Sequence, residues 1–370
     1  IMLFFLSQTP VSSILINPIA EQVTMGQDTA RGISHLLIIY CFILFVFLFN
    51  ALCFVPIGHL ITKLMSNIES LTAYSLNLIG SFIGIILFVF LSFFSTPPVI
   101  WISISFILFL FILKKNFQNY LLSIICVFFL IIILSLNLND KKETIYSPYQ
   151  NITIEHLKTP LNPVIIQSSH LFYQAILNLS EDLSFNNEWR NPGNIFGHHV
   201  DAEHEKEFYN LPYLITNNKP EQILIVGSGA GNDVAAANRF NIKKIDAVEI
   251  DPVIAKLGLK YHPESPYANE NVSLIINDAR TFIKNSKSAY DVIVYGLLDS
   301  QTNLSSKGGI RLDSYVYTIE ALIEAKNKLK KEGYICLSFF VQTPEIGYKI
   351  LAKIPPTSMK SACLIFIYLL

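Results

Sequence analysis

A glycine-rich turn between an apolar run and a helix is the part of this sequence best suited to do chemistry. Residues 223–226 are apolar, the segment 227–231 reads Gly-Ser-Gly-Ala-Gly, and a helix-forming Asp-Val-Ala-Ala-Ala stretch begins at Asp233. Glycines let a backbone turn sharply and approach a ligand closely. About twenty positions beyond the turn, Glu249 ends the next apolar run, where a carboxylate can accept from both hydroxyls of a ribose. A solvated acid at a strand end is the alternative for Glu249. The predicted nucleotide contacts are Gly227, Gly229, Gly231 and Glu249.

Carboxylates follow two later apolar runs. Asp278 can accept from an adenine amino group while the amide of Ala279 addresses the ring, although Asn-Asp is also common in turns. Asp299 either belongs to an active site or caps its own loop. The third glycine of a dinucleotide-binding turn is missing, because Asn232 stands in its place. The sequence therefore predicts a nucleoside of the S-adenosylmethionine type rather than a dinucleotide.

Alternating strands and helices position these residues. Strands are expected over 222–227, 244–249, 272–276, 291–296 and 333–340, and helices over 231–239, 252–260, 279–286 and 313–330. Repeated βαβ units form a parallel sheet whose ligands bind at the carboxyl ends of the strands. Short β-branched and aromatic runs between residues 145 and 177 predict a small antiparallel unit before it. The expected fold class is α/β, a Rossmann-like, methyltransferase-type parallel sheet with a small preceding β-domain.

The N-terminal part has the composition of a membrane protein. Of 370 residues, 52% are hydrophobic and only 15% are charged. Four apolar segments are predicted to cross a membrane as helices, 36–55, 71–95, 99–113 and 120–136. They contain no Asp, Glu, Lys, Arg or His, which favours an anchor over a transport path. We expect a membrane domain over 1–140, the β-domain over 141–200 and the nucleoside-binding domain over 201–370.

The orientation in the membrane is inferred from function, because basic residues divide evenly between the two sides of the four predicted spans. We expect an integral protein of the cell (inner) membrane whose C-terminal domain faces the cytoplasm, where its nucleoside would be found. The chain begins at Ile1, and the run 362–370 supplies at most one more strand. We therefore expect the sequence to be incomplete and to lack the last strand of the sheet.

Charge and cysteine content exclude other classes of partner. The net charge is −1 without a basic stripe, so no nucleic-acid partner is predicted. The five cysteines have neither zinc spacing nor a disulfide framework. The segment 198–204 is rich in His, Asp and Glu, but without a second ligand cluster it is interpreted as a solvated loop and helix start, and no metal is predicted. The sequence is compatible with a homo-oligomer and does not specify one.

Several short motifs occur in a characteristic order. They are Ser147-Pro-Tyr-Gln150, Tyr173-Gln174, Asn210-Leu-Pro212, the glycine turn, Val248-Glu-Ile-Asp-Pro252, Asp278-Ala279 and Tyr290-Asp-Val-Ile-Val294. Together they resemble the spermidine synthase (polyamine aminopropyltransferase) family, and the preceding apolar helices resemble its membrane-fused bacterial branch. The resemblance implies decarboxylated S-adenosylmethionine or S-adenosylmethionine as cosubstrate, with Glu249 on the ribose and Asp278 and Ala279 on the adenine. It also implies a small-molecule amine as acceptor, with Gln150 and Gln174 lining the substrate end, and aminopropyl transfer to a polyamine.

Two positions depart from that family's pattern. The family has Asp-x-x-Asp-Pro after the fourth strand, and the first of these carboxylates, which deprotonates the amine, is replaced here by Gly296. An Asp in the glycine turn that pairs with the aminopropyl ammonium is replaced by Ala230. Asp299 remains to hold or deprotonate the acceptor, and Asp233 either substitutes in part or caps the following helix. Methyl transfer, or a catalytically degenerate nucleoside-binding membrane protein, are therefore the alternatives.

Overall fold

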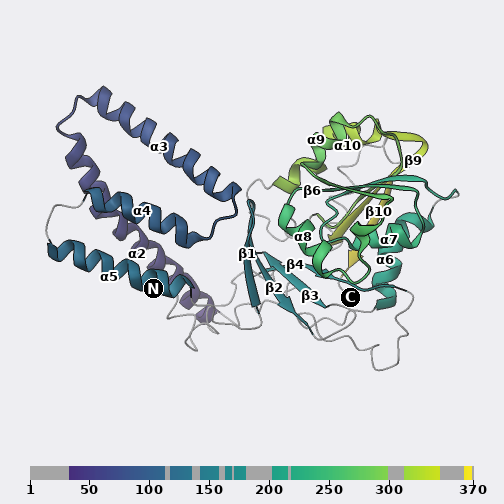
Figure 1. Ribbon diagram of the computed structural model, residues 1–370, viewed down its shortest axis with the longest axis horizontal. Coiled ribbons are helices and arrows are strands. Elements are labelled where there is room, and N and C mark those ends of the chain that lie inside the picture. The colour runs from purple at the N-terminus through teal and green to yellow at the C-terminus, as the bar shows by residue number, and fades with distance from the viewer. Residues whose placement is uncertain are drawn as a thin grey trace. The chain divides into compact units, whose positions relative to one another are not determined.

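The computed structural model describes residues 33–112, 117–135, 142–157, 163–168, 171–180, 202–215, 218–298, 312–341 and 362–368. The chain divides into two compact units (Figure 1). One unit contains the N-terminal helices, and the other contains two β-sheets with their helices.

The N-terminal unit consists of apolar helices. These are α2 (Ile33–Met65), α3 (Ser70–Phe93), α4 (Pro98–Ile112) and α5 (Phe117–Ser135). Two of them, α2 and α3, have the length and the apolar composition needed to cross a membrane, whereas the apolar stretches of α4 and α5 are shorter. Large apolar side chains such as Phe47 and Phe82 are exposed along the two long helices.

A small sheet opens the second unit. Its strands are β1 (Lys142–Tyr146), β2 (Asn151–His156), β3 (Val164–Ser168) and β4 (Leu171–Ile176), in the order β1-β2-β3-β4. The pairs β2–β3 and β3–β4 are antiparallel. Isoleucines from this sheet, among them Ile152 and Ile166, are fully buried in one cluster with Ile254 and Leu257 of α8 (Pro252–Tyr261). The small sheet therefore shares a hydrophobic core with α8.

The large sheet is parallel, which confirms the predicted α/β class. Its strands are β5 (Gln222–Val226), β6 (Lys244–Glu249), β7 (Val272–Ile276), β8 (Tyr290–Tyr295), β9 (Leu329–Val341) and β10 (Ala362–Tyr368). They lie in the order β10-β9-β8-β5-β6-β7, and every pair is parallel. Because β5 has β6 on one side and β8 on the other, the chain reverses its direction across the sheet between β5 and β8. In such sheets the ligand crevice lies at this switch point.

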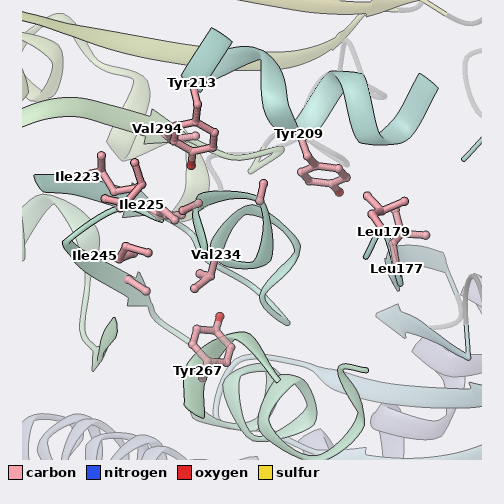
Figure 2. Close-up of a cluster of buried hydrophobic side chains, with 14 of the residues drawn as sticks. Leu177, Leu179, Tyr209, Tyr213, Ile223, Ile225, Val234, Ile245, Tyr267 and Val294 are labelled. Atoms are coloured by element: carbon pink, nitrogen blue, oxygen red, sulfur yellow. The ribbon is translucent and has the colours of Figure 1, made fainter. Parts of the chain in front are cut away.

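Alternate residues of each strand pack against helices on opposite faces of the sheet. One face buries Ile223 and Ile225 against Val234 of α7 (Asn232–Arg239) and the tyrosines of α6 (Ala202–Leu214), as Figure 2 shows. The other face buries Leu224 with residues of α9 (Ala279–Asn285) and α10 (Ile319–Lys326). Figure 1 shows α6 and α7 on one side of the sheet and α9 and α10 on the other.

The helix expected over 313–330 is divided and shorter than predicted. A 3₁₀ helix, η5 (Leu312–Tyr317), comes first, and the side chain of Thr318 then caps α10 by accepting from the amide of Ala321 at 3.2 Å. The following strand begins at Leu329 because its backbone pairs with β8, with an irregularity between Tyr290 and Val292. A Cβ on Gly333 would lie 2.8 Å from the carbonyl oxygen of Tyr290, so this close approach requires glycine.

Candidate nucleoside-binding site

The glycine turn has the backbone conformation that its sequence predicts. Gly227, Gly229 and Gly231 have φ angles of +68°, +57° and +106°, in the region that side chains disfavour. The amide of Gly227 donates to the carbonyl oxygen of Val248 at 2.9 Å, which ties the turn to the end of β6. The hydroxyl of Tyr267, on the 3₁₀ helix η4 (Pro266–Ala268), lies 2.7 Å from the carbonyl oxygen of Gly229. These contacts restrain the conformation of the turn.

Glu249 lies beside this turn and is almost completely buried, with 3% of its surface exposed. Its Oε2 accepts from the amide of Gly229 at 2.8 Å, and its Oε1 accepts from the amide of Asp251 at 2.9 Å. Desolvation raises the pKa of Glu249 to about 7, although these two amides oppose the shift. Glu249 is therefore a fixed group of the cradle and not a solvated strand-end acid. The amide of Ile250 also lowers the pKa of this carboxyl, so three backbone amides address its two oxygens.

Both predicted glutamines reach the carboxyl ends of the large sheet. Gln174 of β4 accepts at Oε1 from the amide of Ala230, at 3.0 Å. Gln150 donates from Nε2 to Oδ2 of Asp251, at 3.2 Å, while Oδ1 of Asp251 caps α8 by accepting from Val253. The shared core of the small sheet and α8 explains why residues so distant in sequence converge here. The structure therefore brings Gln150 and Gln174 to the edge that holds the glycine turn.

Asp278 stands at the end of β7 and caps α9. Its Oδ1 accepts from the amide of Thr281 at 2.7 Å, and Ala279 is the first residue of the helix. One oxygen of Asp278 thus has a local structural role as a helix cap. Burial raises the pKa of Tyr149, and the negative charges of Asp251, Asp278 and Glu249 raise it further.

Sequence reasoning assigned no role to Tyr149 or Asp251, although both occur in quoted motifs. Asp251 precedes Pro252 at the start of α8, which is a recognisable capping signature. The position of Tyr149 has no comparable local signal, because its neighbours come from the ends of other strands.

Asp233 lies within the first turn of α7 and is not its capping residue. Gly231 occupies the N-cap position, and no side chain forms the cap hydrogen bond. Instead, Oδ2 of Asp233 lies 3.0 Å from the position that a Cβ on Gly296 would occupy. Desolvation of its partly buried carboxylate raises the pKa of Asp233 to about 7, with an opposing contribution from its own backbone amide.

Some predicted residues lie outside the described part of the chain. These are Asp299, which follows the last described residue of its segment, and His198, His199 and Asp201 of the histidine-rich segment. Among the described residues, no three His, Cys, Asp or Glu side chains are grouped so that they could hold a metal ion.

Comparison with known proteins relates the C-terminal part of the chain to one family. Residues 204–361 match the model of the spermine/spermidine synthase domain. The chain is 30% identical over 151 residues to a polyamine aminopropyltransferase of Sulfurisphaera tokodaii, covering 39% of this chain and 48% of that protein. It is 35% identical over 152 residues to the polyamine aminopropyltransferase of Sulfolobus acidocaldarius, again covering 39% and 48%.

The chain thus spans about half the length of the curated relatives that it matches. Among solved structures, the spermidine synthase from Thermotoga maritima is similar over 58% of this chain and 64% of its own, with 18% identity and a TM-score of 0.39, which is too low to bear on function.

Proposed function

Since residues 204–361 belong to the spermine/spermidine synthase family, we propose that this chain transfers an aminopropyl group from decarboxylated S-adenosylmethionine to a polyamine. In this reaction a neutral amine nitrogen attacks the aminopropyl carbon next to the sulfonium. The new C–N bond forms as the C–S bond breaks, and the electron pair of that bond stays on sulfur. Methylthioadenosine is released, and the positive charge moves to the product amine.

The buried carboxylate of Glu249, hydrogen-bonded to the glycine turn, is the observation that carries this proposal. The hydroxyls of a ribose placed over the turn would donate to this carboxylate. Such charge-assisted bonds contribute about 1.5–3 kcal/mol each. Because Glu249 is already held by Gly229 and Asp251, little side-chain entropy is lost when the ligand binds.

The remaining roles follow from position. Asp278 and Ala279, at the end of β7, would bind the adenine, and the phenol of Tyr149 stands near enough to flank it. Gln150 and Gln174 would line the end of the site where the aminopropyl group and the amine meet. Asp299 would hold or deprotonate the acceptor amine.

We further propose that the N-terminal helices anchor the chain in the cell membrane. Exposed apolar side chains along α2 and α3 are unfavourable in water, at roughly 25 cal/mol per Å², and favourable in lipid. The C-terminal domain would face the cytoplasm, where its nucleoside is available. Its orientation can be measured by protease accessibility in inside-out vesicles.

The full chain, purified in detergent, provides the direct test. It is incubated with decarboxylated S-adenosylmethionine and putrescine, and methylthioadenosine and spermidine are quantified together. Equal amounts of both products support aminopropyl transfer. A chain that forms neither product over pH 6–9, although it binds methylthioadenosine, is not an aminopropyltransferase for this acceptor and supports the degenerate alternative.

Methyl transfer is the second candidate, and one observation favours it. Ala230 is completely buried in the apolar cluster shared with the small sheet, so this turn position offers no charge to an aminopropyl ammonium. A methyltransferase can work without a catalytic base, because positioning of the reactants alone can accelerate the transfer. Tighter binding of S-adenosylhomocysteine than of methylthioadenosine would favour methyl transfer, and the reverse order would count against it.

A further inference from the structure

The ends of β5 and β8 meet at a point where three backbone or side-chain groups converge. A Cβ built on Gly296, the residue after β8, would lie 3.0 Å from Oδ2 of Asp233 and 3.4 Å from the carbonyl oxygen of Gly227. This point is at the switch in strand order, where parallel sheets of this kind bind their ligands. The carboxylate of Asp233 thus borders the space that a side chain at position 296 would enter.

Among the described residues, no cation pairs with the carboxylate of Asp233. Burial raises the pKa of Tyr209 and Tyr213 on α6 and of Tyr267 on η4, and the negative charge of Asp233 raises these pKa values further. A partly buried carboxylate without a cation is costly, and it is stabilised when a cationic ligand enters.

We propose that Asp233, delivered by α7, is the catalytic carboxylate of the transfer reaction in place of the strand-end residue that Gly296 does not supply. This inference rests on the proposed aminopropyl transfer and assigns its base. The carboxylate accepts one proton from the ammonium of the acceptor polyamine and becomes a neutral acid. The freed lone pair of the amine then attacks carbon, and sulfur keeps the electrons of the broken C–S bond. Asp299 is left to hold the acceptor.

Gly296 and Asp233 are so close that a side chain at position 296 would limit the room of the Asp233 carboxylate. A side chain at 296 would crowd Oδ2 of Asp233, whereas glycine leaves that oxygen room to approach the ends of the strands. The carboxylate of Asp233, on α7, therefore borders the space that a side chain following β8 would otherwise occupy. Asp233 is in the first turn of α7, and the positive end of the helix dipole partly stabilises its ionised form.

Kinetics of the full chain in detergent test this assignment. Asp233→Asn keeps the shape of the side chain and removes the base, and we expect kcat to fall by about 10²–10⁴-fold. Affinity for methylthioadenosine, measured by calorimetry, is expected to change less than threefold, which shows that the variant is folded. Glu270→Gln is the matched control. It removes an exposed carboxylate just before the amino end of β7, away from the carboxyl ends of the strands, and should leave kcat unchanged.

A second experiment moves the carboxylate from α7 to the residue that follows β8. Asp233→Ala empties the space beside position 296, and Gly296→Asp in the same chain places a carboxylate there. We expect the kcat of the double variant to be at least tenfold higher than that of Asp233→Ala. A purely structural role of Asp233 would not allow such rescue from another element.

The outcomes separate the two proposals. A wild-type chain that binds methylthioadenosine but transfers no aminopropyl group overturns the proposed function, and the assignment of Asp233 as its base with it. An active wild type whose Asp233→Asn variant keeps its kcat overturns only the assignment of Asp233. Asp299→Asn is expected to raise KM for the amine more than it lowers kcat, and the opposite split would move the base to Asp299.

Discussion

The carboxylate of Glu249 accepts a hydrogen bond from the amide of Gly229 at 2.8 Å, which joins the end of β6 to the turn that follows β5. Two consecutive strands are thereby connected at the edge of the sheet where parallel folds bind ligands. The turn and the acid form one unit, so a change in either should affect stability and the proposed nucleoside binding.

Glu249→Gln tests this unit directly. Replacing one carboxylate oxygen by an amide removes a charged acceptor for the ribose and presents a donor to the amides of Gly229 or Asp251. We expect methylthioadenosine to bind about 10–100-fold more weakly, because hydrogen bonds to charged groups contribute about 1.5–3 kcal/mol. Titration calorimetry measures the loss, with Glu270→Gln as the control. Unchanged affinity would remove Glu249 from the ribose site.

The raised pKa of Glu249 predicts a pH-dependent stability difference. The native carboxyl titrates at about 7, above its unfolded value of 4.5, so the native state binds more protons between these values and its stability falls as pH rises through this window. Relative to the wild type, Glu249→Gln should therefore gain about 1–3 kcal/mol in free energy of unfolding between pH 5 and pH 8. Denaturation of the nucleoside-free chain in detergent at both pH values measures this. A pH-independent difference would contradict the buried titration.

Tyr267→Phe should loosen the turn. The phenol lies 2.7 Å from the carbonyl oxygen of Gly229 and 2.9 Å from Oγ of Ser228, and all three groups are buried. Without the hydroxyl, the carbonyl loses a buried partner, which costs about 1–3 kcal/mol. We expect a lower Tm and weaker nucleoside binding by thermal shift. Tyr315→Phe, at an exposed tyrosine, is the control and should change neither.

Gly227→Ala should disrupt the turn for two separable reasons. The φ of +68° costs a side chain about 1–2 kcal/mol, and the new Cβ would lie only 1.7 Å from Cδ2 of Leu298. Gly227→Ala combined with Leu298→Ala removes the overlap and keeps the backbone cost. The double variant is therefore expected to recover part of the lost stability in thermal denaturation. Complete recovery would show that the left-handed conformation is not required.

Local patterns were sufficient to predict the conformation of the glycine turn and the position of Glu249 beside it. The glycines at 227–231 signal positive φ angles, and the spacing to Glu249 places the acid at the next strand end, because both features depend on one βαβ unit. The predicted helix 313–330 is divided in the structure, because Thr318 caps α10 and pairing with β8 draws Leu329 into a strand. Tertiary pairing outweighed helix propensity there.

The sequence alone determined a parallel α/β domain with a glycine turn and a strand-end acid, because strand alternation and turn chemistry are encoded within a few residues of each other. It also showed that Gly296 and Ala230 lack side chains able to carry charge. Only the tertiary structure decided that Asp233 lies beside Gly296, since the meeting of α7 with the end of β8 depends on the strand order of the sheet. In the same way, burial decided that Glu249 and Asp233 titrate near neutral pH, because desolvation arises from residues that surround them in space and not in sequence.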